Sequence, residues 1–176
     1  MRSLSAATRT LIAAAAVLAA AFAAVPGAAT TVTFAPAAAE KMHTYGEAER
    51  ATLQSAILTA VSREMSRRAV PAGLAISVTV KEVTPTRPTP EQAHADPTLD
   101  VVSTRYLGGA ALTGEVRDAS QRVVATVSYS HFAPTLPLGS RSFDRWADAR
   151  LAIDQFAVKL AAACHDLSPA PTTARG

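Results

Sequence analysis

The segment from Thr104 to Phe132 constrains the fold most, because apolar and polar residues alternate on both sides of one short polar stretch. That stretch, Asp118–Gln121, separates the two alternating runs and predicts two β-strands joined by a tight turn. Successive strand side chains point to opposite faces, so one face of this hairpin is apolar and the other small and polar. With the turn centred between Ala119 and Ser120, the expected apolar pairs are Val116 with Val123, Leu112 with Val127 and Ala110 with Tyr129, and the expected polar-face pairs are Thr113 with Thr126 and Ala111 with Ser128.

Two helices are predicted from apolar stripes with helical spacing. The four-residue spacing of apolar side chains over Glu47–Ala69 predicts an amphipathic helix that Pro71 and Gly73 end. A second stripe predicts a helix over Phe143–Cys164, with Ser142 as its N-cap. The stripe of the first helix consists of Leu53, Ile57, Val61 and Met65, and that of the second of Phe143, Trp146, Ile153, Phe156 and Leu160.

Two further strands and two connections complete the chain. Thr30–Phe34 and Leu74–Val80 alternate as strands do, and a change of phase at Lys81–Glu82 predicts a bulge or the strand end there. Ala37–Gly46 is expected to be a linker. Thr84–Asp100 contains four prolines and is expected to be disordered, with a functional loop as the alternative.

These elements follow the order β-α-β-β-β-α, and each helix and strand has one apolar side. The sequence therefore predicts an α+β fold: a two-layer sandwich in which two helices lie on one face of a largely antiparallel four-stranded sheet. Residues 30–167 are expected to form this single domain, and residues 168–176 a disordered tail.

The first 29 residues have the pattern of a secretory signal peptide. Arg2 and Arg9 precede an apolar run from Leu11 to Val25, which is short for a membrane span of about 20 residues. We expect cleavage, a periplasmic or secreted protein, and no stable transmembrane span afterwards. No cysteine lies directly after the run, so no lipobox is present. Without Arg2 and Arg9 the chain carries 15 basic against 14 acidic residues, and no clustered basic patch suggests nucleic-acid binding.

Two features admit more than one interpretation. Cys164 is the only cysteine, and we interpret it as a small buried apolar residue, with an intermolecular bridge or a reactive thiol as alternatives. Arg63, Arg67 and Arg68 lie near the end of the first predicted helix, where positive charge suits the helix dipole. We interpret them as a solvated helix end, and an anion-binding cluster is the alternative.

No motif with catalytic or metal-binding spacing is present. The four histidines, His43, His94, His131 and His165, do not occur in zinc-type pairs, and phosphate-binding glycine motifs are absent. A catalytic triad could be composed of His131, a serine and an aspartate, but the spacing of these residues in the sequence does not support one. The serine would be Ser130 or Ser140, and the aspartate Asp100 or Asp118. The sequence predicts no enzyme, no cofactor and no metal.

Two motifs resemble those of small exported bacterial proteins and lipoproteins of unknown function. The first is GGAALTGEVRDASQRVVATVSY, with a turn like the D-x-x-G turn of those proteins except that Gln121 stands where glycine is typical. The second is the W-x-D-A pattern in FDRWADARLAIDQFAVKLA. The resemblance implies a cell-envelope location and no activity.

The leading functional prediction is a non-catalytic cell-envelope protein that binds a partner through the exposed sheet face or edge. The alternative is a module that binds a small ligand or lipid between sheet and helices, and a hydrolase is a weaker third. Trp146 is expected to anchor the core, with ligand stacking as its alternative role. The candidate partner-binding residues are Ser77, Thr79, Thr113, Thr126 and Ser128, and the candidate ligand mouth consists of Tyr106, Phe132 and Trp146.

Overall fold

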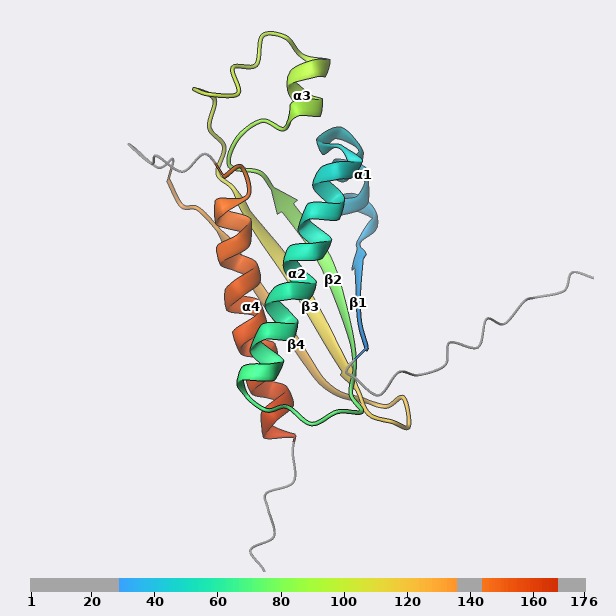
Figure 1. The fold of residues 1–176 in the computed structure, drawn as a ribbon. Helices are drawn as coiled ribbons and strands as arrows, with labels where there is room; N and C mark the ends of the chain where they lie inside the picture. The colour runs from blue at the N-terminus through green and yellow to red at the C-terminus, as the bar shows by residue number, and fades with distance from the viewer. Residues whose placement is uncertain (1–28, 136–143, 168–176) are drawn as a thin grey trace, which may run out of the picture.

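The computed structural model describes residues 29–135 and 144–167 (Figure 1). The predicted signal peptide, apart from Ala29, and the tail after residue 167 lie outside the described residues, as does Ser142. The second predicted helix begins at Ala147, with Trp146 as its N-cap, so the prediction of a start at Phe143 with Ser142 as N-cap was wrong. The elements are β1 (Ala29–Phe34), α1 (Pro36–Tyr45), α2 (Glu47–Arg67), β2 (Ala75–Thr84), α3 (Pro90–Ala95), β3 (Gly109–Arg117), β4 (Val123–Phe132) and α4 (Ala147–Asp166).

The fold is α+β with one four-stranded sheet in the order β1-β2-β3-β4. β1 pairs with β2 in parallel, whereas β2–β3 and β3–β4 are antiparallel. The sheet is therefore mixed, and the prediction of a largely antiparallel sheet was wrong. The reason is the connection through α1 and α2, which returns the chain to the starting end of β1 so that β2 runs in the same direction.

Helices α2 and α4 lie side by side in front of the sheet (Figure 1), and α4 packs against β3 and β4. The stripes predicted for the two helices are buried where described, and Phe156 and Leu160 of α4 approach the sheet at Gly114. A Cβ atom at Gly114 would lie 2.9 Å from the Phe156 ring, so glycine permits the close approach. The region between Leu53, Val80, Leu112 and Ile153 holds no water-sized space.

The predicted linker Ala37–Gly46 is instead mostly helical, because α1 covers Pro36–Tyr45. Pro36 lies in the first turn, where its missing N–H and fixed φ suit a helix. Ala38, Met42 and Tyr45 are buried at helical spacing. The interpretation of Pro36 only as the end of β1 hid this helix.

The segment Thr84–Asp100 is ordered, contrary to the prediction of disorder. β2 extends to Thr84, residues 85–89 are buried, and α3 follows. Thr89 and Gln92 form a reciprocal capping box at the start of α3. Prolines in this segment therefore begin a short helix and fill a buried connection, and Figure 1 shows α3 beyond the end of the sheet.

The β3–β4 hairpin is present, but its predicted register was wrong by two residues. Leu112 pairs with Tyr129 and Thr113 with Ser128, and not with Val127 and Thr126. The loop contains three residues, because Asp118 N–H donates to Arg122 O and Gln121 has a left-handed φ of 64°. Next to this loop, the β3–β4 ladder is irregular between Val116 and Arg117. A shift of two preserves the side-chain faces from Gly109 to Val116, so the polar and apolar faces there are as predicted. Beyond the irregularity, Val123 pairs with Arg117 rather than with Val116 and is 46% exposed, so its predicted place on the apolar face was wrong.

Asp118 organises this turn. Its Oδ1 accepts hydrogen bonds from the Ser120 N–H at 2.8 Å and the Ser120 hydroxyl at 2.6 Å. The Ser120 hydroxyl and the Arg122 side chain hold the pKa of Asp118 at about 2, below its usual value. The lowered pKa means that the carboxylate stabilises the turn above about pH 4 and that this contribution is lost as pH falls through about 2.

Candidate functional site

The five predicted partner-binding residues lie on one face of the sheet, in two cross-strand rows. The first row joins Ser77 to Thr126 through Glu115, and the second joins Thr79 to Ser128 through Thr113. These side chains are exposed or half-buried. The structure thus brings together all five residues on one face of the sheet.

Two hydroxyls of β1 extend these rows and were missed as site residues. Thr31 pairs with Ser77 and Thr33 with Thr79. Their alternation within TTVTF could have identified them, but the position of β1 beside β2 could not be read from the sequence. Hydroxyl contacts run along the rows: Thr33 to Thr79 at 3.4 Å, Thr31 to Ser77 at 3.4 Å and Thr113 to Ser128 at 3.0 Å.

The β4 edge borders this polar face. No strand lies beyond β4 within the part of the chain that the structure describes. β4 has ten residues, VVATVSYSHF, with no proline and no Lys, Arg, Asp or Glu among them. Proteins commonly protect an edge strand by making it short or by placing proline or charge in it. β4 has none of these protections, whereas β1 at the other edge has six residues and Pro36 soon after it.

The ladder shows which backbone groups of β4 point away from β3. Ala133 N–H donates to Gly108 O at 2.9 Å, and one register holds from Gly109–Phe132 to Val116–Ala125. Hydrogen-bonded and non-hydrogen-bonded pairs alternate in an antiparallel ladder. The backbone N–H and C=O groups of Thr126, Ser128 and Ser130 therefore point to the outer edge, and those of Val127 and Tyr129 point to β3.

The helix side of the β4 edge carries a positive charge. The Lys159 ammonium of α4 lies 5.5 Å from the centre of the Tyr129 ring. Lys159 is exposed, Tyr129 is half-buried, and Tyr129 pairs with the buried core residue Leu112. The edge therefore has hydroxyls on one side and a lysine over an aromatic ring on the other.

The three residues of the predicted ligand mouth do not meet at an opening. Trp146 is buried, contacts the Tyr45 ring edge-on at 5.8 Å, and donates its indole N–H to Glu49 at 2.5 Å. Phe132 pairs with Gly109 in the sheet, and the Tyr106 N–H donates to Thr86 O at 2.9 Å. Trp146 is thus a core anchor, and the described interior offers no space for a ligand at the sheet–helix contact described above.

Glu49 was not identified from the sequence as a residue that joins two helices. Its carboxylate is buried between the Trp146 indole and the Arg145 guanidinium, so it joins the start of α2 to the start of α4. The partners lie 96 and 97 residues away along the chain. No local pattern could have indicated these contacts.

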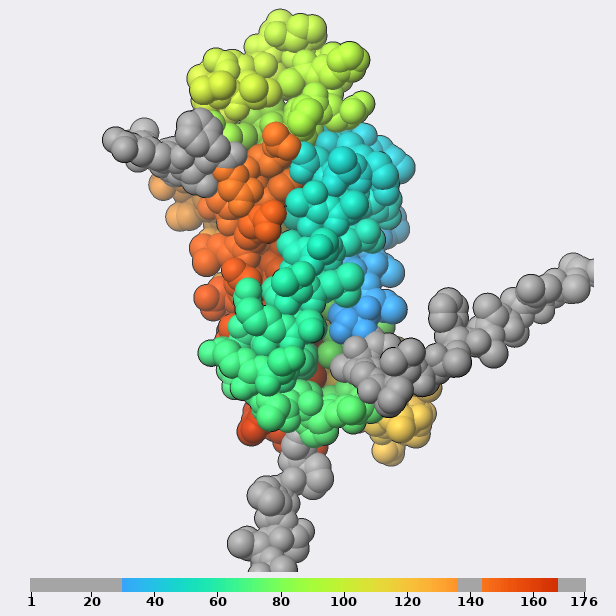
Figure 2. All heavy atoms as spheres, in the orientation of Figure 1, coloured from blue at the N-terminus to red at the C-terminus, as the bar shows by residue number. Residues whose placement is uncertain are grey.

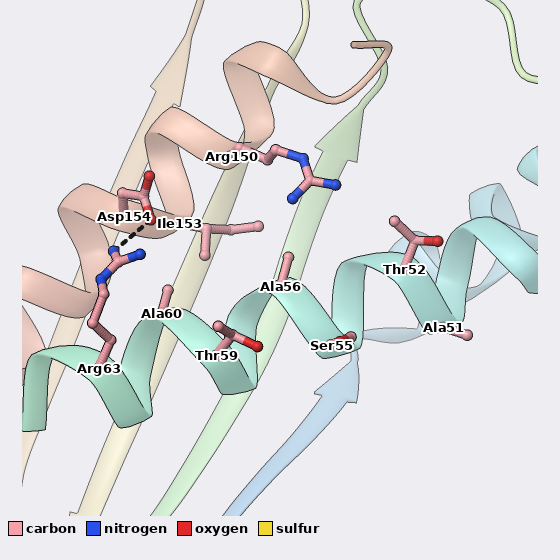
Figure 3. A pocket seen from close by; sticks show the side chains of 10 residues that line it. All are labelled: Ala51, Thr52, Ser55, Ala56, Thr59, Ala60, Arg63, Arg150, Ile153 and Asp154. Atoms are coloured by element: carbon pink, nitrogen blue, oxygen red, sulfur yellow. Dashed lines mark hydrogen bonds and ion pairs between the residues drawn. The ribbon is translucent and has the colours of Figure 1, made fainter. Parts of the chain in front are cut away.

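A shallow groove of about 590 Å³ follows the contact between α2 and α4 on the outer surface (Figures 2 and 3). Figure 3 shows an ion pair of Arg63 with Asp154, at 3.0 Å, toward one end and Arg150 toward the other. Arg150 is itself paired with Asp144 at 3.0 Å. Alanine, serine and threonine side chains of α2 form most of the remaining lining: Ala51, Thr52, Ser55, Ala56, Thr59 and Ala60.

Two of the three arginines near the end of α2, Arg63 and Arg67, form ion pairs, whereas the Arg68 Nε is buried without a hydrogen-bond partner among the described residues. Arg63 and Arg67 both contact the buried Glu64, and the Arg67 hydrogen bond is the larger cause of the lowered pKa of Glu64. Cys164 is buried in the core, and burial raises its pKa to about 11. Its thiol therefore stays protonated near neutral pH, as expected for a small core residue.

The groups of the possible triad are dispersed. Asp118 lies at the turn end of β4 and His131 near the other end, about 25 Å along the strand. Ser130 and His131 point to opposite faces, Asp100 binds Ser103 at 2.6 Å, and Ser140 lies outside the described residues. Within residues 29–135 and 144–167, no group of three or more metal-ligating side chains occurs.

No protein-family model matches the chain, and comparisons with curated proteins and with solved structures also yielded no match. The resemblance to small exported bacterial proteins therefore stays a prediction. Over the same described residues, no helix is both long and apolar enough to cross a membrane.

Proposed function

We propose that this chain is an exported, non-catalytic protein of the cell envelope that binds an extended segment of a partner protein along β4. The observation that carries this proposal is the ten-residue β4 edge without proline or charge. An extended segment can add to such an edge through main-chain hydrogen bonds, while its alternate side chains give specificity. The apolar run after Arg2 and Arg9 supports export.

The proposal assigns different roles to the two sides of the added segment. In the proposed two-layer arrangement, α2 and α4 occupy one face of the sheet and leave the other for the partner. The outward backbone groups of Thr126, Ser128 and Ser130 would form the ladder with the partner. The hydroxyl rows that end at Thr126 and Ser128 would contact its small polar side chains.

A proline substitution at Ser128 tests the edge directly. The Ser128 N–H points outward, and proline is tolerated in an edge strand at such positions because no internal ladder bond is lost. We expect Ser128→Pro to leave the fold intact by circular dichroism and to weaken partner binding at least about tenfold. The proline ring removes one donor and occupies the space of the added strand.

The measurement is photocrosslinking in intact bacterial cells, with p-benzoylphenylalanine in place of Ser130. We expect one discrete crosslinked product in the envelope fraction, which Ser128→Pro abolishes and Ser128→Ala, with its N–H retained, preserves. The same photoreactive group at Leu58, an exposed residue of α2, serves as the control. Crosslinking that persists with Ser128→Pro, or that arises equally from Leu58, would contradict binding at β4.

A further inference from the structure

The charge beside the β4 edge restricts which segment can add to it. Lys159 is exposed, and none of the described carboxylates lies within ion-pair distance of it. Its neighbours one helical turn before and after, Gln155 and Ala163, are uncharged. The ammonium therefore lies over Tyr129 as an isolated positive charge on this side of α4.

An added strand would lie within reach of this charge. Neighbouring strands are about 4.8 Å apart, and helix α4 packs over β3 and β4. The strand next to β4 therefore runs along the flank of α4, and every second side chain of that strand faces the helix. The helix-facing side chain nearest Tyr129 would come close to the Lys159 ammonium.

A second copy of this chain fits the edge poorly. Antiparallel pairing of two β4 strands with full overlap is centred near Ser128, the residue next to Tyr129. The two α4 helices would then lie about 10 Å apart across the two-fold axis. The two Lys159 ammonium groups would face each other near that axis, and like charges in such a position oppose association.

We propose that the segment accepted by β4 carries a carboxylate on its helix-facing side, beside Tyr129, where it pairs with Lys159. This inference rests on the proposed binding at the β4 edge. The partner is therefore an extended peptide segment with an acidic residue on the side that faces helix α4. The charge complementarity selects it over basic segments and over a second copy of the chain.

Three synthetic peptides provide the test. Each is a capped twelve-residue peptide of alternating threonine and valine, with one central valine replaced by glutamate, glutamine or lysine. Fluorescence anisotropy measures the affinity of each for the full chain and for Lys159→Gln, Lys159→Glu and Ser128→Pro. We expect the glutamate peptide to bind about fivefold more tightly than the lysine peptide at low salt. Lys159→Gln should remove this preference, and Lys159→Glu should invert it.

The outcomes distinguish the two proposals. Equal affinities of the three peptides for the unmodified chain, all lost with Ser128→Pro, would overturn the carboxylate inference and leave binding at β4 intact. Binding of no peptide, or binding of all three that Ser128→Pro does not change, would contradict edge binding and the inference with it. A glutamate preference that survives Lys159→Gln would also overturn the assignment to Lys159.

Discussion

Replacing Gly109 with alanine is expected to destabilise the fold by about 3 kcal/mol, at the upper end of the cost of overpacking. A Cβ atom at this position would lie 2.2 Å from the His131 carbonyl oxygen and 2.6 Å from the Phe132 Cα. Both atoms belong to the paired strand β4, so the clash can be relieved only if the ladder separates. Thermal unfolding should show a fall in Tm of roughly 6–12 °C.

Gly114→Ala is the matched control within the same strand. Its Cβ would lie 2.9 Å from Phe156 Cζ and 3.1 Å from Leu160 Cδ1, which are ends of side chains that can move. We expect a loss of about 1 kcal/mol there. Equal losses for the two variants would contradict the pairing of Gly109 with Phe132.

Trp146→Ala is expected to cost about 3–5 kcal/mol in the free energy of unfolding, as for other buried tryptophans. The indole is 2% exposed, packs edge-on against Tyr45 and binds the buried Glu49 carboxylate. Trp146→Phe separates these contributions, because it keeps much of the packing and removes the N–H. We expect it to cost about 1–3 kcal/mol, the usual effect of leaving a buried polar group with one partner fewer.

The measurement is chemical denaturation followed by far-ultraviolet circular dichroism. Leu151→Ala is the control on the same helix, since Leu151 is 48% exposed and should change the stability by about 0.5 kcal/mol or less. A cost below about 1 kcal/mol for Trp146→Ala would contradict the interpretation of Trp146 as a core anchor.

Local patterns predicted the elements whose apolar residues recur over several turns or pairs. The helix expected over Glu47–Ala69 corresponds to α2, and the break at Lys81–Glu82 corresponds to the irregularity of the β2–β3 ladder. The side-chain faces of the hairpin between Gly109 and Val116 were also predictable, because the period of two survives a register error of two residues. The polar face could therefore be anticipated although its pairs could not.

Features that depend on distant parts of the chain were not predictable. The left-handed conformation of Gln121 moved the hairpin register, since a residue other than glycine rarely adopts it. The parallel pairing of β1 with β2 depends on how α1 and α2 return the chain. The contacts of Glu49 with Arg145 and Trp146 join residues nearly one hundred positions apart. Short helices such as α1 offer too few turns for an apolar stripe to identify them.

The open β4 edge is tested most directly by amide hydrogen exchange, resolved by residue with nuclear magnetic resonance, in the full chain without a partner. The account predicts an alternation: rapid exchange at Thr126, Ser128 and Ser130, whose N–H groups point outward, and slow exchange at Val127 and Tyr129, whose N–H groups point to β3. Uniformly slow exchange along these five residues would show that the edge is already covered, and would contradict the proposal that β4 is free to accept a partner.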